Sequence, residues 1–299
     1  MTKSLDLDEI ESRPILDDIS VVIPTLGRPI LEESLYWILR GSAWPRDLIV
    51  VDQGINSAVE TLMSTIGTVG IQAVYLPSQQ RGRAAGINRG LERVQTRFVA
   101  ITDDDCFVER DWLMNMAAHL RTYPESIVTG RVEAGSEDVI VVVTSPVPSV
   151  QYRPKLTFDH MSGGNVGTSA KVLDRVGLFD EHPSVRTAED GEWAYRALRA
   201  GISIHYRPDI CVRHFGWRDE TQRMRQYQDY ARSHGGFYGK YLRRGDWFIA
   251  LRALLHHLRA LRRWLKGQLN RDQDAREFGW AYLTGLMPGI VAGLRRGKS

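Results

Sequence analysis

Three consecutive aspartates form the most concentrated charge at the end of any apolar stretch in this sequence. Asp103, Asp104 and Asp105 follow the run Phe98–Ile101, whose apolar character predicts a buried strand. Neighbouring carboxylates repel one another unless protons or a cation lie between them. A divalent cation such as Mg²⁺ takes oxygen ligands and often binds substrate phosphates as well. The triplet therefore suits a metal–diphosphate site, although an acidic turn capping a helix that starts at Asp111–Leu113 explains the same residues.

The direction of the three side chains follows from the expected extended backbone. Side chains alternate along a strand, so Asp103 and Asp105 are predicted to point to one side and Asp104 to the other. This arrangement would bring the carboxylates of Asp103 and Asp105 together and set that of Asp104 apart from them.

Other polar residues follow three further predicted strands. Four apolar runs alternate with segments of helical spacing, at Ile19–Ile23, Asp47–Val51, Ile71–Leu76 and Phe98–Thr102. This order predicts an α/β fold with a parallel sheet and crossover helices. The residues that follow the first three runs include Thr25, Arg28, Asp52, Arg81 and Arg83. Because ligands bind where the carboxyl ends of parallel strands gather, this mixture of carboxylates and arginines indicates a nucleotide diphosphate site.

The overall composition is that of an ordinary globular protein. At 299 residues, with 43% hydrophobic and 25% charged residues, the chain can form one large α/β domain or two smaller ones. Cys106 and Cys211 lack metal-type spacing and favour a reducing, cytosolic setting. Residues 1–18 have no secretory signal and are predicted to be a flexible leader. Neither a Gly-x-Gly-x-x-Gly motif after the first strand nor a Walker motif occurs, which disfavours dinucleotide redox chemistry and ATP hydrolysis.

The C-terminal quarter is strongly basic and is predicted to be a helical extension. Residues 221–299 contain 16 Lys and Arg against 5 Asp and Glu, a net +11, and the remaining 23 against 31 give −8 for residues 1–220. Between Asp246 and Gly267, leucines recur at helical spacing with arginines on another face. Such a helix suits an anionic membrane surface, and packing on the catalytic domain is the alternative. The apolar stretch Phe278–Leu294, interrupted by Pro288, is predicted to lie at an interface rather than to span a membrane.

Six segments are informative because of their order. They are Val21–Thr25, Val50–Gly54, Arg81–Gly82 with Asn88–Gly90, Asp103–Asp105, Ser162–Asn165 leading to Val176–Glu181, and Glu189–Trp193 with Arg196 and Gly201. Together, from about residue 19 to residue 216, they resemble the family 2 glycosyltransferases of GT-A fold. The sequence departs from the family pattern at Gln53, where the family usually has Asp or Asn, and at Ile87, where it often has Arg.

The resemblance implies a fold and a division of the chain. The fold would be α/β, a GT-A-type, Rossmann-like and mostly parallel sheet flanked by helices. Residues 19–110 would bind the nucleotide sugar, and residues 111–220 would form the acceptor-binding and catalytic part of the same domain. Residues 221–299 would be the basic amphipathic helical extension.

The resemblance also implies roles for individual residues in a metal-dependent, inverting transfer from a nucleotide-diphosphate donor to a hydroxyl acceptor. Asp190 matches the catalytic base, and Asp105, Asp103 and His214 match the site of a divalent metal, Mg²⁺ or Mn²⁺. Asp52 would hold the nucleoside, and Asp103 would also lie near the ribose. The residues implied to bind the nucleotide sugar are Pro24, Thr25, Arg28, Asp52, Arg81, Asn88, Asp103 and Asp104. Those implied on the acceptor side are Gly164, Asn165, Glu189 and Trp193.

The expected donor is a UDP-sugar, with dTDP- and GDP-sugars as alternatives, and the expected acceptor is a glycan or a lipid-linked molecule. The reaction would serve polysaccharide or glycolipid synthesis for the cell envelope. It would take place in the cytoplasm, with the protein peripheral on the inner face of the cell membrane through residues 246–299. No nucleic acid is expected, because the basic residues lie in amphipathic helices without a reading motif.

Two other functions compete with this interpretation. A nucleotidyltransferase acting on sugar phosphates would share the sheet and the metal carboxylates, but its Gly-rich, Lys-containing first loop is missing. An inactive nucleotide-sugar-binding membrane scaffold would be expected to have lost an acid, yet Asp103, Asp105 and Asp190 are all present.

Overall fold

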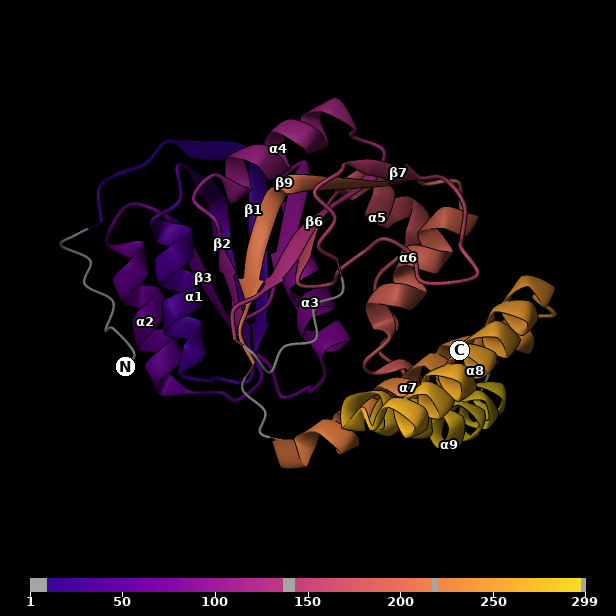
Figure 1. The fold of residues 1–299 in the computed structure, drawn as a ribbon. Coiled ribbons are helices and arrows are strands. Elements are labelled where there is room, and N and C mark those ends of the chain that lie inside the picture. The colour runs from indigo at the N-terminus through magenta and orange to yellow at the C-terminus, as the bar shows by residue number, and fades with distance from the viewer. Residues whose placement is uncertain (1–9, 137–142, 217–219, 297–299) are drawn as a thin grey trace. The chain divides into compact units, whose positions relative to one another are not determined.

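The computed structural model describes residues 10–136, 143–216 and 220–296 of the chain (Figure 1). The chain divides into two compact units, which we name the sheet unit and the helical unit. The sheet unit contains Met1–Arg153, His160–Phe179 and Arg196–Gly216. The helical unit contains Pro154–Asp159, Asp180–Tyr195 and Trp217–Ser299. Each unit is therefore assembled from segments that lie far apart in the sequence.

The sheet unit is built on a nine-stranded sheet. The strands follow the order β3-β2-β1-β4-β8-β6-β9-β5, and β7 pairs with β9. Their bounds are β1 (Ile15–Thr25), β2 (Trp44–Asp52), β3 (Gln72–Pro77), β4 (Phe98–Thr102), β5 (Cys106–Val108), β6 (Ile127–Ala134), β7 (Ser149–Gln151), β8 (Asn165–Ser169) and β9 (Ile204–His214). The first four strands pair in parallel, as the sequence predicted. β8 joins β4 in the antiparallel direction, so the other half of the sheet is mixed.

Helices of the sheet unit cover both faces of this sheet (Figure 1). They are α1 (Ile30–Leu39), α2 (Ser57–Gly67), α3 (Arg83–Leu91), α4 (Trp112–Thr122) and α5 (Ala170–Val176). Leu35 of α1 and Met116 of α4 join the same buried core as Val21 of β1. On the opposite face, a Cβ on Gly90 of α3 would lie 2.4 Å from the Cγ1 atom of Val22. Glycine at this position allows α3 to lie directly on β1.

The strand register brings the carboxyl ends of the first four strands to one edge. Thr25 at the end of β1 lies opposite Asp52, and Asp52 in turn lies opposite Pro77 at the end of β3. Val22 of β1 is paired with Ile101 of β4, so β4 ends at the same edge. The alternation of strands and helices in the sequence predicted that polar residues meet at one edge of the sheet. The register now shows which strands are neighbours at that edge.

The helical unit contains three long helices in the described part of the chain. These are α7 (Glu220–Leu242), α8 (Trp247–Asn270) and α9 (Gln273–Arg295), and the unit also contains a 3-10 turn, η2 (Pro183–Val185), and the beginning of α6 (Glu189–Arg199). Asp246 begins α8, because its carboxylate accepts hydrogen bonds from the backbone N–H groups of Phe248 and Ile249. Phe237 of α7 and Leu286 of α9 lie in the buried core of this unit.

Glycines let the backbones of α7 and α9 approach closely. A Cβ on Gly289 would lie 2.1 Å from the carbonyl oxygen of Arg232, and one on Gly239 would lie 2.2 Å from that of Ile290. The interruption predicted at Pro288 is wrong, because α9 continues through it. Pro288 is exposed, so water can satisfy the carbonyl group that loses its helical donor. None of the helices in the described ranges combines the length and apolar character that crossing a membrane requires.

Candidate active site

A tight turn after β4 redirects the three aspartates. The carbonyl oxygen of Asp103 accepts a hydrogen bond from the backbone N–H of Cys106 at 3.2 Å. Asp104 and Asp105 both contact the guanidinium group of Arg28, which follows β1. The predicted alternation, with Asp103 and Asp105 on one side, is therefore wrong, because the turn replaces the extended backbone on which it depended.

Within the triplet, Asp103 and Asp104 differ in their access to solvent. Asp104 is 2% exposed, and its Oδ2 atom accepts a hydrogen bond from Thr25 Oγ1 at 2.6 Å. Asp103 accepts a hydrogen bond from Arg83 Nε at 2.7 Å, and its side chain is 22% exposed. A Cβ on Gly164 would lie 2.8 Å from Asp103 Oδ2, so glycine is needed beside this carboxylate. Asp104 thus anchors the turn, whereas Asp103 keeps access to a ligand.

Asp105 and His214 form the pair that is best suited to a metal. The pairing of β5 with β9 sets Cys106 opposite His214, and His214 Nε2 lies 3.4 Å from Asp105 Oδ1. Burial acts to raise the pKa of Asp105, but the hydrogen bond and charge of His214, together with Arg28, hold this pKa below its usual value. The carboxylate is therefore ionised, as a metal ligand must be.

The donor atoms at this position fit a divalent cation. A carboxylate oxygen of Asp105, the sulfur of Cys106 and a ring nitrogen of His214 all lie within 4.8 Å of one another. Oxygen and imidazole ligands suit Mn²⁺, and carboxylates suit Mg²⁺. Burial raises the pKa of the Cys106 thiol well above its ordinary value, so the thiol stays protonated and is a poor ligand. The fit therefore rests on Asp105 and His214.

Asp52 shapes the loop that follows β2. Its side chain is buried, and its Oδ1 atom accepts a hydrogen bond from the backbone N–H of Gly54 at 2.8 Å. Its Oδ2 atom accepts hydrogen bonds from the backbone N–H of Asn56 at 2.6 Å and from the Tyr75 hydroxyl at 3.2 Å. These bonds fix the loop between β2 and α2. Contact between Asp52 and a nucleoside stays a prediction.

Gln53 connects β2 with the loop that begins α3. Its Nε2 atom donates hydrogen bonds to the carbonyl oxygens of Gln80 at 2.6 Å and Gly82 at 2.9 Å. Gly82 has a φ of +123°, a backbone conformation that favours glycine. The same loop carries Arg81, whose side chain is exposed. The departure from the family's Asp or Asn thus has a structural explanation, because the longer amide reaches this loop.

Asn88 and Pro24 hold α3 in place. The side chain of Asn88 donates to the carbonyl oxygen of Phe179 and accepts from its N–H, both at 2.9 Å. Pro24 lies against α3, where a Cβ on Gly86 would be 2.8 Å from the Pro24 Cβ. The predicted contacts of these two residues with a nucleotide sugar stay predictions.

Asn165 belongs to the interior of the sheet unit. Its Nδ2 group donates hydrogen bonds to the carbonyl oxygens of Arg131 at 2.9 Å and Ile210 at 3.0 Å. Its Oδ1 atom accepts a hydrogen bond from Trp112 Nε1 at 2.8 Å. Both amide hydrogens are used, so Asn165 joins strands of the sheet instead of facing an acceptor as predicted.

Asp190 lies in the first turn of α6, within the helical unit. Glu189 and Trp193 on the same helix are 3% and 0% exposed, whereas Asp190 is half-buried. Trp193 is thus a core residue, and its predicted place on the acceptor side stays a prediction. Burial lowers the pKa of His234 on α7, and the charge of Asp190 opposes that shift. His234 therefore lies within electrostatic reach of the predicted base.

Two further acids of the helical unit, Asp180 and Glu192, are buried and paired with cations. Lys240 Nζ lies 2.6 Å from Glu192 Oε1 and 2.7 Å from Asp180 Oδ2. The Tyr241 hydroxyl donates to the same Glu192 oxygen at 2.6 Å, and Arg296 pairs with Asp180 at 2.7 Å. Burial acts to raise the pKa of Asp180, but Arg296, Lys240 and the backbone N–H of His182 hold this pKa well below its usual value. We name these five residues the buried ion network, and it ties α6, α7 and the end of α9 together.

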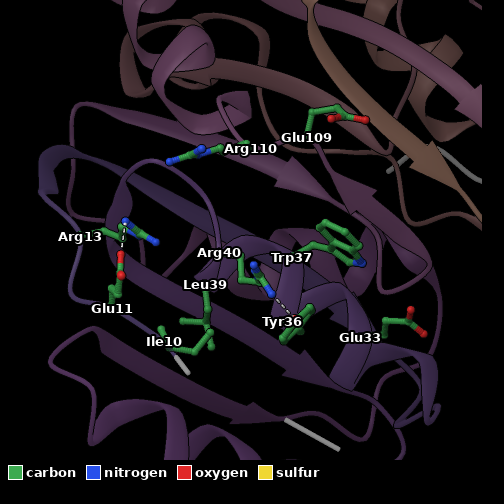
Figure 2. Close-up of a pocket in the computed structure, with 10 residues that line it drawn as sticks. All are labelled: Ile10, Glu11, Arg13, Glu33, Tyr36, Trp37, Leu39, Arg40, Glu109 and Arg110. Carbon is green, nitrogen blue, oxygen red and sulfur yellow. Dashed lines mark hydrogen bonds and ion pairs between the residues drawn. The ribbon is translucent and has the colours of Figure 1, made fainter. Parts of the chain in front are cut away.

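A surface pocket of about 900 Å³ lies elsewhere in the sheet unit (Figure 2). Its residues come from the N-terminal segment, from α1 and from the connection between β5 and α4. Three acids and three arginines line it, namely Glu11, Glu33, Glu109, Arg13, Arg40 and Arg110. Because its charges balance and it contains none of the predicted site residues, this pocket gives no support to a nucleotide or metal site.

A family model described as "Glycosyl transferase family 2" matches residues 20–169, just over half of the chain. The matched residues include the ends of β1, β2 and β4, where the acids and arginines described above gather. The chain belongs to glycosyl transferase family 2. The family resemblance inferred from the six motifs is therefore confirmed.

Similar proteins agree with this assignment. The chain is 26% identical over 219 residues to the pre-mycofactocin glycosyltransferase of Mycobacterium tuberculosis, a match that covers 68% of this chain and 44% of that protein. The chain thus spans less than half the length of this relative. The mannosyltransferase PcManGT from Pyrobaculum calidifontis, solved with GDP-Man and Mn²⁺, has a TM-score of 0.63 at 18% identity and covers 95% of this chain and 88% of its own. GalNAc-T7, solved with UDP, GalNAc and Mn²⁺, has a TM-score of 0.57 at 15% identity and covers 76% of this chain and 51% of its own. These likenesses confirm the predicted GT-A-type α/β fold.

Several residues with partners in the structure were not assigned a role from the sequence. Arg83 was noted beyond the third strand, and the structure pairs it with Asp103. Cys106 directly follows the aspartate triplet, a position that could have flagged it as a neighbour of the metal site. For Lys240 no sequence signal was available, because its carboxylate partners lie 48 and 60 residues away along the chain.

Proposed function

We propose that this protein is a metal-dependent, inverting glycosyltransferase that transfers a sugar from a nucleotide-diphosphate donor to a hydroxyl group. The observation that carries the proposal is the pair of Asp105 and His214, 3.4 Å apart at the edge where the parallel strands end. Membership of family 2 supports the same reaction. The fold relatives solved with Mn²⁺ and a nucleotide or nucleotide sugar support a divalent metal and a nucleotide-sugar donor.

The sheet unit would bind the nucleotide diphosphate. Asp105 and His214 would hold Mg²⁺ or Mn²⁺, and a bound divalent cation would stabilise negative charge on the departing diphosphate. Arg81 is exposed on the loop before α3 and would contact the nucleotide or its phosphates. Asp103 would accept hydrogen bonds from the ribose, because its carboxylate keeps access to solvent.

Asp190 would act as the catalytic base. Its carboxylate would take the proton of the acceptor hydroxyl while the hydroxyl oxygen forms a bond to the anomeric carbon. The bond between that carbon and the diphosphate oxygen breaks, and its electron pair leaves with the nucleotide diphosphate. Attack from the side opposite the leaving group inverts the anomeric configuration. A positioned carboxylate base contributes roughly 10²–10⁴-fold to such a step.

The finer assignments are also proposals. A UDP-sugar is our first choice of donor, with dTDP- and GDP-sugars as alternatives, since fold relatives were solved with UDP and with GDP-Man. The acceptor would be a glycan or a lipid-linked molecule of cell-envelope polysaccharide or glycolipid synthesis. The protein would work in the cytoplasm, bound peripherally to the inner face of the cell membrane.

The direct test measures release of nucleotide diphosphate from a panel of UDP-, dTDP- and GDP-sugars with Mg²⁺ or Mn²⁺ and candidate acceptors. We expect release with one donor class and its loss on chelation of the metal. The absence of release with every donor and acceptor would contradict the proposed reaction.

Metal binding is tested separately from turnover by the electron paramagnetic resonance signal of added Mn²⁺. The variants Asp105→Asn and His214→Ala should bind Mn²⁺ more weakly than the unaltered protein. Asp174→Asn is the matched control, because Asp174 is exposed on α5 away from these ligands. Equal Mn²⁺ binding by all these proteins would remove Asp105 and His214 from the proposed metal site.

A further inference from the structure

One face of α8 carries an uncovered stripe of large apolar side chains. Its members recur every three or four residues, so they line up along one side of the helix. They are between 38% and 83% exposed, and they are Trp247, Leu251, Leu254, Leu258, Leu261, Leu265 and Leu269. We name these residues the leucine stripe. An apolar surface that runs the length of a helix of 24 residues marks a site of interaction.

The leucine stripe is not used to hold the helical unit together. α8 packs through another face, on which Ile249, Ala253 and Ala260 are buried. That face is fixed further by Arg252, which forms a buried ion pair with Asp159 at 2.7 Å. The fold of the unit therefore accounts for one face of α8 and leaves the leucine stripe without a partner among the described residues.

A basic pocket of about 310 Å³ adjoins the C-terminal half of the stripe. The residues that line it include Arg259, Arg262, Arg263, Lys266, Asn270 and Asp272. Arg263 is paired with Asp274, and Arg259 donates to the carbonyl oxygen of Leu156. Within the described ranges, Arg262 and Lys266 are exposed and form no ion pair. They follow Leu261 and Leu265 directly in the sequence.

The charges near the leucine stripe favour an anionic binding partner. From Trp247 to Asn270 the helix contains five Arg and Lys residues and no Asp or Glu. Asp272 of the basic pocket is engaged as the N-cap of α9, where it accepts a hydrogen bond from the backbone N–H of Ala275 at 3.0 Å. A second copy of α8 would offer only further cations and no acid to Arg262 and Lys266, and like charges repel. An anionic bilayer instead offers apolar chains for the leucines and phosphates for the cations.

We propose that α8 docks on an anionic phospholipid bilayer. The leucine stripe enters the interfacial region, and Arg262 and Lys266 bind lipid phosphate groups at its side. The proposal rests on the proposed function only for which membrane is bound, the inner face of the cell membrane. It adds the surface of the protein that binds there. Vesicle binding is measured without any sugar nucleotide, so its failure is distinct from failure of the transfer reaction.

The experiment is flotation of the full chain with phosphatidylcholine vesicles that contain or lack phosphatidylglycerol. We expect co-flotation with the phosphatidylglycerol vesicles and little with phosphatidylcholine alone. Added salt should weaken binding, because it screens the lipid charge. Inorganic phosphate at matched ionic strength should weaken binding no further. Equal binding to both kinds of vesicle, or specific displacement by phosphate, would overturn the proposal.

Two sets of variants locate the docking surface. The double variant Arg262→Gln, Lys266→Gln should lower the partition coefficient roughly 25-fold, because each cation near an anionic surface contributes about fivefold. The triple variant Leu254→Ser, Leu258→Ser, Leu261→Ser should lose co-flotation almost completely. The matched controls, Arg93→Gln with Lys171→Gln and Met114→Ser, alter exposed residues of the sheet unit and should bind like the unaltered protein.

The competing occupant is a second copy of the chain. Light scattering without vesicles should give the mass of a single chain for the unaltered protein and for the triple variant. A dimer that the triple variant converts to single chains would overturn membrane docking as the purpose of the stripe. So would flotation that all the variants retain.

Discussion

Two clusters in this protein each pair acids with a cation but differ in their access to solvent. In the sheet unit, Asp103 is paired with Arg83, and their side chains are 22% and 24% exposed. In the helical unit, Lys240 is 9% exposed between Asp180 at 8% and Glu192 at 0%. Both clusters combine acids with cations at hydrogen-bonding distance. Only the first leaves part of its charge open to a ligand.

The difference indicates which carboxylates do chemistry and which hold the fold. A buried carboxylate that is surrounded by cations and a hydroxyl group is already compensated and cannot be reached. Asp103, which is paired with the partly exposed Arg83, can exchange this partner for a metal or a diphosphate. The access of Asp103, and not the density of charge, therefore separates its pair with Arg83 from the buried ion network. Asp105 is as buried as Asp180, at 8% exposure, but its partner His214 is 36% exposed.

Removal of the central cation from the buried ion network should produce the largest change in stability. In Lys240→Met, Asp180 and Glu192 lose their shared partner inside the helical unit. We expect a loss of roughly 3–5 kcal/mol in the free energy of unfolding, because a buried charge would be left with too little compensation. Urea unfolding monitored by circular dichroism measures it.

The matched variant in the sheet unit is Arg83→Met. Its pair with Asp103 is partly solvated, so we expect a loss of at most about 1 kcal/mol. Equal losses for Lys240→Met and Arg83→Met would remove the contrast between the two clusters.

The close contact of α7 with α9 should be the next most sensitive feature. In Gly289→Ala, the new Cβ would meet the carbonyl oxygen of Arg232, and we expect a loss of roughly 1–3 kcal/mol from overpacking. Gly67→Ala in α2 is the control, because nothing lies within 4 Å of its Cβ position. That control should be neutral or slightly stabilising in thermal unfolding. If Gly289→Ala matched the control, the glycines would not be needed for packing.

Acid should destabilise the helical unit through His256. Burial, His234, Arg259, Arg252 and His257 lower the pKa of His256 to about 2, whereas its unfolded value is about 6.5.

Between these values only the unfolded chain binds the proton. The free energy of unfolding should therefore fall by roughly 1.4 kcal/mol for each pH unit below 6.5. Urea titrations from neutral to mildly acidic pH measure this slope. His256→Gln should reduce it, and the same slope in that variant would exclude His256 as its source.

The first half of the fold could be predicted because its signals are local. Buried parallel strands are nearly continuous apolar runs, and each run here ends at a polar residue such as Thr25, Asp52 or Asp103. The direction of the aspartates could not be predicted, because the turn that closes at Cys106 overrides strand alternation. The internal role of Asn165 was also hidden, since its partners belong to β6, β9 and α4.

The helical extension was predicted from periodicity, but its packing was not. The leucine spacing of α8 identified an amphipathic helix, and the structure shows that most of those leucines face outward. Sequence spacing defines a face of a helix without saying what covers it. Pro288 suggested an interruption of α9, and only the position of α7 reveals the glycines of α9 as a packing surface.

The most direct test of the account compares Asp105→Asn and Asp190→Asn in two assays, Mn²⁺-dependent binding of nucleoside diphosphate and turnover. We expect Asp105→Asn to lose both. Asp190→Asn should bind the nucleotide like the unaltered protein and lose turnover by roughly 10²–10⁴-fold, because only the base is removed. The control Asp229→Asn alters a half-buried acid of α7 that pairs with Arg186, and it should retain both. Loss of nucleotide binding in Asp190→Asn, or turnover that survives in it, would contradict the account.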